Sequence, residues 1–192
     1  LPRPLGYGVS LSVNDGVVCL GGSDAHRHYA EVFLLRWQAG AITTSPLPPL
    51  PKPCANLSGG LLGTTIVVAG GIETPGATTA LRSFWALDLA ETPPQWRELE
   101  PWPGPGRMLA VAAVQDQSFF LVSGAALSAD AQGKPVRRYL NDAYRYTRGH
   151  GWRRIADLPR PAVAAPTPAP ALGQSTFLVL GGDDGCLVAA EH

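Results

Sequence analysis

The sequence predicts an all-β fold, a fragment of a β-propeller built from four-stranded antiparallel blades with negligible helix. Three observations lead to this prediction. An apolar segment that ends in two small residues recurs four times, each copy has further short strand-like segments around it, and 22 glycines and 19 prolines separate these segments within 192 residues. Turn residues at this density favour many short strands over a helical bundle.

The recurring segment is an apolar run followed by a glycine-type pair. Its four copies occupy residues 17–22, 66–71, 119–124 and 177–182. The pairs begin at residues 21, 70, 123 and 181, so the repeats are spaced by 49, 53 and 58 residues. Because the runs are apolar at successive positions, we expect both faces of each strand to be buried between neighbouring blades. Repeats of about 50 residues are typical of kelch propellers.

The glycine pairs have a structural interpretation. Glycine permits backbone conformations and close approaches that a Cβ atom would block near the crowded axis of a propeller. A phosphate-binding loop is the alternative. It is excluded because neither G-x-G-x-x-G nor G-x-x-x-x-G-K-[ST] opens a helix in this sequence.

Three further strands complete each repeat. A strand of small residues precedes the apolar run, and its copies are 7–13, 56–62, 108–114 and a proline-interrupted stretch from Ala162. A third strand follows a loop of variable length, at 31–37, 83–89 and 142–147. Tryptophan marks the fourth strand in two copies, 95–99 and 151–155, and proline closes each repeat.

These elements divide one domain, residues 1–192, into blades at about 5–50, 54–103 and 107–159 and a partial blade at 161–192. Propellers typically need four to eight blades to close a ring. We therefore predict that the chain is part of a longer propeller. On its own it should form an open arc with exposed blade faces and low solubility.

Composition and charge exclude several classes of partner. Fifteen basic residues balance 15 acidic ones, so nothing favours a nucleic acid or an anionic membrane surface. No apolar run approaches the roughly 18–20 residues that span a bilayer. The sequence starts at Leu1 without a signal-peptide pattern, and the oligomeric state and compartment stay open. Its three cysteines lack the C-x-x-C spacing of zinc and redox sites.

Several segments resemble the bacterial kelch proteins of the N-acetylneuraminate epimerase (sialic acid mutarotase) family. They are residues 5–11, residues 50–53 leading into Gly59-Gly60, residues 141–146 and residues 181–185. The segment Gly6-Tyr7-Gly8-Val9-Ser10 resembles the last blade of that family but precedes the segment that resembles the first. The resemblance is therefore to the cyclically permuted branch.

This resemblance implies a six-bladed bacterial propeller, in the periplasm or the cytoplasm, that interconverts the anomers of N-acetylneuraminate or a related sugar acid. It implies no metal and no organic cofactor, and the partner that it implies is this small sugar-acid substrate. Family members use a Glu with an Arg a few residues later, in the loop after one blade's glycine pair. By blade order that pair is expected beyond the end of this chain. Glu73 and Arg82 imitate it on a different blade and are the weaker candidates within the chain.

A cation is also expected, because a bidentate guanidinium is well suited to a sugar carboxylate. If the strands run from the axis outward in chain order, the proline links share a face with the loops between second and third strands. Basic residues recur at these links, just before the innermost strands: Arg3, Lys52, Arg107 and Arg160. We expect substrate binding from Arg107 first and from Arg3 and Arg160 next; the alternative is that they are solvated or pair with nearby carboxylates.

Other patterns have simpler interpretations. His26 and His28 flank Arg27, and on a strand this H-x-H pattern would place both imidazoles on one face. A third ligand is not evident, so no metal site is predicted. Tyr144 and Tyr146 alternate on a predicted strand and are expected to pack between blades.

Two other functions are alternatives to the mutarotase. The chain could belong to a non-catalytic kelch module that binds a protein or a glycan, because the fold alone does not determine activity. A copper radical oxidase on the same scaffold is weaker, because its Tyr, His and Cys ligands cannot be assembled from this sequence.

Overall fold

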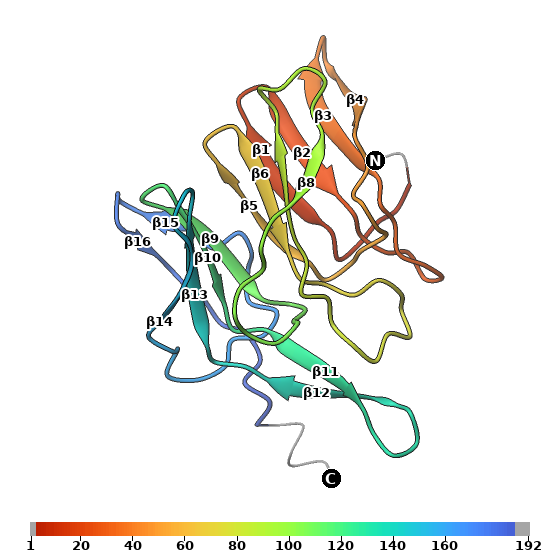
Figure 1. Ribbon diagram of the computed structural model, residues 1–192. Coiled ribbons are helices and arrows are strands. Elements are labelled where there is room, and N and C mark those ends of the chain that lie inside the picture. Colours follow the sequence, from red (N-terminus) through yellow and green to blue (C-terminus); the bar gives the residue numbers. More distant parts are fainter. Residues whose placement is uncertain (1–2, 187–192) are drawn as a thin grey trace.

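The computed structural model describes residues 3–186, and that part of the chain contains strands and turns but no helix (Figure 1). It therefore offers no helix long and apolar enough to cross a membrane. Three antiparallel sheets of four strands follow one another along the chain, with strand orders β1-β2-β3-β4, β5-β6-β7-β8 and β9-β10-β13-β14. The predicted all-β propeller architecture is confirmed.

The strands have the following bounds. Blade 1 contains β1 (Val9–Val13), β2 (Gly16–Leu20), β3 (Val32–Gln38) and β4 (Ala41–Leu47). Blade 2 contains β5 (Ser58–Leu62), β6 (Thr65–Ala69), β7 (Phe84–Asp88) and β8 (Trp96–Glu98). Blade 3 contains β9 (Val111–Gln115), β10 (Ser118–Val122), β13 (Ala143–Thr147) and β14 (Gly151–Ile155). A hairpin of β11 (Ala125–Ala129) and β12 (Pro135–Tyr139) is inserted in blade 3, and β15 (Ala171–Leu172) and β16 (Thr176–Phe177) follow it.

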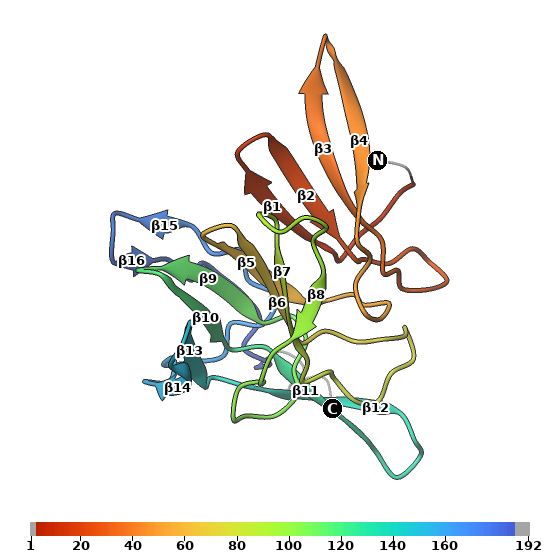
Figure 2. The same cartoon turned by 45° about the horizontal axis from the view of Figure 1, so that its top comes forward.

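The blades are arranged radially, with their first strands innermost. Strand β5 lies against both β1 and β9, and the sheets spread outward from these three strands (Figure 2). Strands β4, β8 and β14 form the outer edges of the sheets. The three innermost strands surround the axis of the propeller. The second strands all end at the same end of this axis, so the segments that follow the glycine pairs lie on one face of the molecule.

Apolar packing between neighbouring sheets holds the blades together. All five residues of β6 are buried, as its apolar sequence predicts. Between blades 2 and 3 the rings of Phe84, Tyr146 and Trp152 form a cluster, with Phe84 lying 4.9 Å from each of the other two ring centroids. Tyr144 is buried in the same cluster, so the predicted packing role of both tyrosines is confirmed.

A chain of backbone hydrogen bonds joins the blades at the axis. The N–H of Asn56 donates to the carbonyl of Tyr7, that of Leu109 to Asn56, and that of Ala164 to Leu109, at 2.8–2.9 Å. All four residues adopt the left-handed conformation, with φ between 54° and 60°. We call this set of bonds the axial chain. The axial chain explains why β1, β5 and β9 begin two or three residues later than predicted. Its left-handed residues precede these strands and are not in the extended conformation that a strand requires.

The glycine pairs lie directly beside the axial chain. Gly70 and Gly71 have φ of 67° and 95°, and the N–H of Gly71 donates to the carbonyl of Arg107 in the next blade at 2.8 Å. A Cβ atom on Gly70 would collide with that same carbonyl oxygen. Ser123 takes the equivalent place in blade 3 with φ of 58°, and its hydroxyl donates to Leu140 and accepts from the N–H of Ala162. The structural role predicted for the glycines is confirmed.

Two segments differ from the sequence-based expectation. Residues 125–140, expected as a loop, form the β11–β12 hairpin, which projects away from the blades (Figure 1). The fourth copy forms only the two-residue strands β15 and β16 in place of two full strands. Prolines at 166, 168 and 170 explain why the strands of the fourth copy are short, because proline has no N–H to donate to a strand ladder.

Replacing Gly70 by alanine should destabilise the protein by about 1–3 kcal/mol. The added methyl group must displace the Arg107 carbonyl that accepts the inter-blade hydrogen bond. Gly76→Ala is the matched control, because a Cβ atom there meets nothing within 4 Å. Urea unfolding followed by tryptophan fluorescence measures both variants. Equal midpoints for the two would contradict this account of the glycine pair.

Candidate functional site

A cavity of about 330 Å³ opens on the face where the second strands end. Three regions form its wall: the start of the innermost strands, the loops after the first two glycine pairs, and the β11–β12 hairpin. Its lining residues are Tyr7, Ser23, His28, Asn56, Ile72, Pro75, Ala77, Met108, Leu127, Pro135 and Arg137. We call it the axial cavity, because Tyr7 and Asn56 belong to the axial chain. Six of these residues are apolar and five are polar, so the lining combines apolar surface with groups that can fix the orientation of a small molecule.

His28 is the unusual polar residue of this wall. Only 8% of the residue is exposed, and neither ring nitrogen has a hydrogen-bond partner among residues 3–186. Burial lowers the pKa of the His28 imidazole below its ordinary value, and the backbone of Thr74 offsets this only in part. The ring is therefore neutral at neutral pH. Buried polar groups normally find partners, so an unpartnered imidazole beside a cavity points to a ligand.

The segment around His28 is not a strand. Residues 24–27 form a turn in which the Asp24 carboxylate accepts from the N–H groups of His26 and Arg27 at 2.8 and 2.9 Å. His26 is exposed whereas His28 is buried, so the two imidazoles do not share one face. Within residues 3–186, no three His, Cys, Asp or Glu side chains gather as a metal site would require.

Arg137 supplies a positive charge to the axial cavity. It lies on β12, it is exposed, and it makes no ion pair with the described part of the chain. Its cross-strand partner Leu127 also lines the cavity. Arg138 is paired with Ala126 and, because side chains alternate along a strand, lies on the opposite face of the hairpin. The two adjacent arginines therefore differ in access to the cavity but not in charge.

Two further polar groups of the cavity come from the axial chain. Tyr7 is 71% exposed, and Asn56 is half-buried beside it. Their backbones are fixed by the hydrogen bond between them, so the side chains are presented from a rigid base. Together the hydroxyl, amide and guanidinium groups can bind an anion that also carries hydroxyl groups, with the buried His28 ring in the wall beside it.

Arg107 does not occupy the position that the sequence predicted for it. It is fully buried, and its guanidinium donates to both carboxylate oxygens of Asp142 at 2.9 and 2.8 Å and to the carbonyl of Ser123 at 2.7 Å. Trp102 and Tyr144 lie within 5.5 Å of the guanidinium carbon. Because a sugar carboxylate cannot reach a buried group that is already paired, the expected substrate role does not agree with the structure. Arg107 instead anchors blade 3.

Asp142 completes this buried pair. Burial by itself would raise the pKa of the Asp142 carboxyl, but the hydrogen bonds and the charge of Arg107, together with the Tyr144 hydroxyl and the charge of Arg154, outweigh that effect and hold the pKa below its ordinary value. The Tyr144 hydroxyl donates a third hydrogen bond to Asp142 at 2.7 Å. The carboxylate is thus ionised throughout the neutral range and keeps Arg107 in place.

None of the other predicted site residues lines the axial cavity. Arg3 pairs with Glu31 at 2.8 Å, and Arg160 pairs with Asp184 at 3.4 Å. Glu73 pairs with Lys52 at 3.4 Å. Arg82 donates to the carbonyl of Trp102 at 2.9 Å, so the structure does not bring Glu73 and Arg82 together as a pair. For Arg3, Lys52 and Arg160 it supports the alternative interpretation as surface ion pairs.

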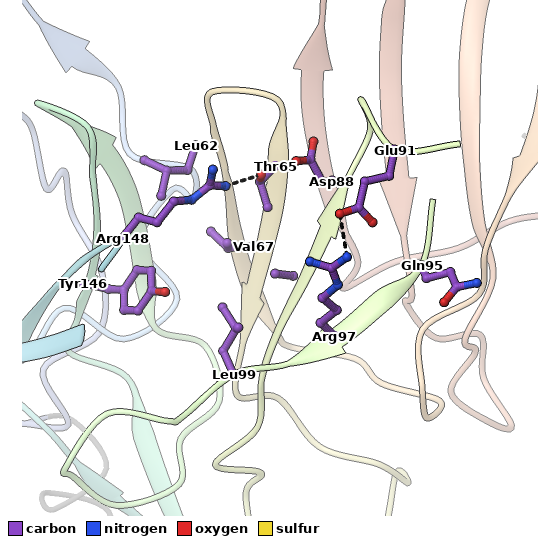
Figure 3. A pocket seen from close by; sticks show the side chains of 11 residues that line it. Leu62, Thr65, Val67, Asp88, Glu91, Gln95, Arg97, Leu99, Tyr146 and Arg148 are labelled. Atoms are coloured by element: carbon purple, nitrogen blue, oxygen red, sulfur yellow. Dashed lines mark hydrogen bonds and ion pairs between the residues drawn. The ribbon is translucent and has the colours of Figure 1, made fainter. Parts of the chain in front are cut away.

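A second cavity, of about 300 Å³, lies between blades 2 and 3 at the opposite ends of the strands (Figure 3). Its charged groups are already engaged: Arg97 pairs with Glu91 at 2.7 Å, and Arg148 donates to Thr65 across the two blades. Asp88 accepts from Thr64 at 2.8 Å. Because these polar groups bind one another, this cavity is an inter-blade contact, and the axial cavity is the better candidate for a ligand.

Sequence reasoning missed His28 as a ligand-facing group and missed Arg137 altogether. The signal for Arg137 was present, since two adjacent arginines stand in the longest loop of the predicted site face. Nothing in the sequence indicated that His28 would lack a partner. That property arises only when the loops of blades 1 and 2 pack together.

The fold and this cavity define a β-propeller segment with a ligand-sized site at its axial face. A comparison with solved structures agrees with this class. The structure of YjhT matches 85% of this chain and 59% of its own, with a TM-score of 0.68 and 15% sequence identity. At that identity the likeness concerns the fold alone.

Sequence comparisons give partial matches. N-acetylneuraminate epimerases from Haemophilus influenzae strains PittEE and 86-028NP are each 33% identical over 99 residues, which is 52% of this chain and 24% of each epimerase. The serine/threonine-protein phosphatase BSL2 of Arabidopsis thaliana is 27% identical over 187 residues, or 93% of this chain and 17% of the phosphatase. No protein-family model matches. The chain thus spans a quarter or less of these curated relatives.

Replacing Arg107 by methionine should cost about 3–5 kcal/mol of folding free energy, because Asp142 would be left as a buried unpaired charge. Arg154→Met removes an exposed arginine that pairs with Asp157 and should cost much less. Thermal unfolding of both variants tests the difference. A stable Arg107→Met protein with weakened sugar-acid binding would restore the ligand role instead.

Proposed function

We propose that the complete protein is a mutarotase that interconverts the anomers of N-acetylneuraminate or a related sugar acid. The observation that carries this proposal is the guanidinium of Arg137, which makes no ion pair within residues 3–186 and lines the same cavity as a neutral imidazole. The 33% identity to N-acetylneuraminate epimerases over half of the chain supports it. The cyclic permutation and the Glu…Arg pair beyond this chain stay predictions.

The chemistry matches the groups of the axial cavity. Mutarotation requires a proton to move between the anomeric hydroxyl and the ring oxygen while the ring opens and closes again. Arg137 can hold the carboxylate through charge-assisted hydrogen bonds, and Asn56 and Tyr7 can bind hydroxyl groups of the sugar. Fixing the carboxylate orients the anomeric carbon, which lies next to it in such a sugar acid.

A non-catalytic binding module is the second candidate. It is favoured by the match to BSL2, in which a segment similar to nearly this whole chain makes up only 17% of a much longer protein. A propeller can therefore be one part of a larger protein, where it presents its loops to a partner. This alternative predicts binding at the axial cavity without any change in the rate of mutarotation.

The test of the mutarotase uses a matched pair of variants in the complete protein. After release of the α anomer of N-acetylneuraminate, NMR follows the conversion to the β anomer above the spontaneous rate. Arg137→Gln should lower catalytic efficiency by roughly ten- to a hundredfold, the loss of about 1.5–3 kcal/mol expected for a charge-assisted hydrogen bond. Arg138→Gln removes the same charge from the opposite hairpin face and should have little effect.

Glu98→Ala, on the outer strand β8, is a second control and should leave the rate unchanged. Equal losses for Arg137→Gln and Arg138→Gln would reject Arg137 as a direct ligand. An intact protein that accelerates the mutarotation of no sialic acid or aldose would reject the enzyme and leave the binding module.

A further inference from the structure

We propose that His28 takes up a proton when an organic anion binds in the axial cavity, so that ligand binding is coupled to pH. The proposal rests on the proposed function in one respect, that the ligand of this cavity is a sugar acid. It adds a property that neither the fold nor the similarities assign: the site should bind an anion and a proton together.

The first step of the argument is the burial of His28. Its nitrogens are covered and unpartnered within residues 3–186, although the residue lines the cavity. In the absence of ligand an imidazolium would carry two buried N–H donors, and the backbone of Thr74 would compensate for them only in part. Unsatisfied buried donors and an uncompensated buried charge are both costly. The free site therefore keeps the ring neutral, in agreement with the lowered pKa of His28.

The second step is that the surrounding charges cannot stabilise an imidazolium. On its own loop, the Asp24 carboxylate is occupied by the Tyr29 hydroxyl and by two backbone N–H groups, and Arg27 lies over the Tyr29 ring at 4.9 Å. From blade 2, Glu73 is paired with Lys52.

The other walls of the cavity add no negative charge. Arg137 of the hairpin is a cation, so it disfavours a positive charge on His28. The remaining titratable group of the lining is the side chain of Tyr7 from the axial chain. The described wall of the cavity thus lacks a carboxylate of its own.

A bound anion reverses this balance. A carboxylate held by Arg137 brings negative charge into the cavity that His28 lines, and an opposite charge within about 4–6 Å favours the protonated imidazole. The pKa of His28 should then rise on binding. At a pH between the pKa of His28 in the free protein and its higher pKa in the complex, each ligand binds with uptake of a proton. The affinity for the ligand therefore increases as the pH falls, by up to about tenfold per pH unit.

Calorimetry of the full chain with N-acetylneuraminate tests the proposal. Titrations at pH 6–7 in buffers of different ionisation enthalpy should show uptake approaching one proton per ligand. His28→Asn should abolish the uptake and flatten the pH dependence while it still binds at pH 8. His26→Asn, an exposed neighbour on the same loop, should keep the uptake. N-acetylglucosamine, a neutral sugar, should cause none.

The outcomes separate the two proposals. Binding of N-acetylneuraminate without proton uptake, or with the same uptake in His28→Asn, would overturn the role of His28 and leave the proposed function intact. Failure of the unaltered protein to bind this sugar acid would overturn the proposed site itself. If His28→Asn does not fold, NMR titration of the His28 ring in the unaltered protein decides, because its pKa must rise when the ligand is added.

Discussion

The structure depends on how the backbones of successive blades meet at the axis. In the axial chain, a left-handed residue in each blade accepts a hydrogen bond from the equivalent residue of the next. Apolar packing alone would let neighbouring sheets slide, because it is non-directional. The hydrogen bonds fix the relative height of the blades, and the glycine pairs beside them make the close approach possible. The loops that follow these pairs are consequently held on one face.

Much of this fold could be predicted from the sequence because the apolar runs and the glycines recur in each repeat. The buried strand β6 and the packing of Tyr146 follow directly from that pattern. The axial chain could not be predicted, because its left-handed residues are Tyr7, Asn56, Leu109 and Ala164, none of them glycine. Their conformation is imposed by the bond to the next blade, which is a tertiary effect. The intrinsic propensities of these residues do not predict this left-handed conformation.

The candidate site was less predictable than the fold for a similar reason. Sequence reasoning found basic residues before the innermost strands but ranked Arg107 first as a ligand group, and the fold buries Arg107 in an ion pair. Arg107 is neutralised by Asp142, 35 residues away, whereas Arg137 has no such partner in the part of the chain described here. A guanidinium becomes a ligand group only if the fold leaves it unpaired. That condition depends on packing between distant segments, which the spacing of residues does not reveal.

The division between axis and loops also explains how proteins of this class can differ in function. The axial chain uses backbone atoms, so it tolerates changes of side chain, and a TM-score of 0.68 with 15% identity fits that tolerance. The axial cavity takes His28 and Arg137 from segments whose length varies between repeats, including the β11–β12 hairpin. Insertions there change the ligand-facing surface without disturbing the hydrogen bonds between blades. The specificity of this protein should therefore reside in its loops and hairpin, where His28 and Arg137 lie.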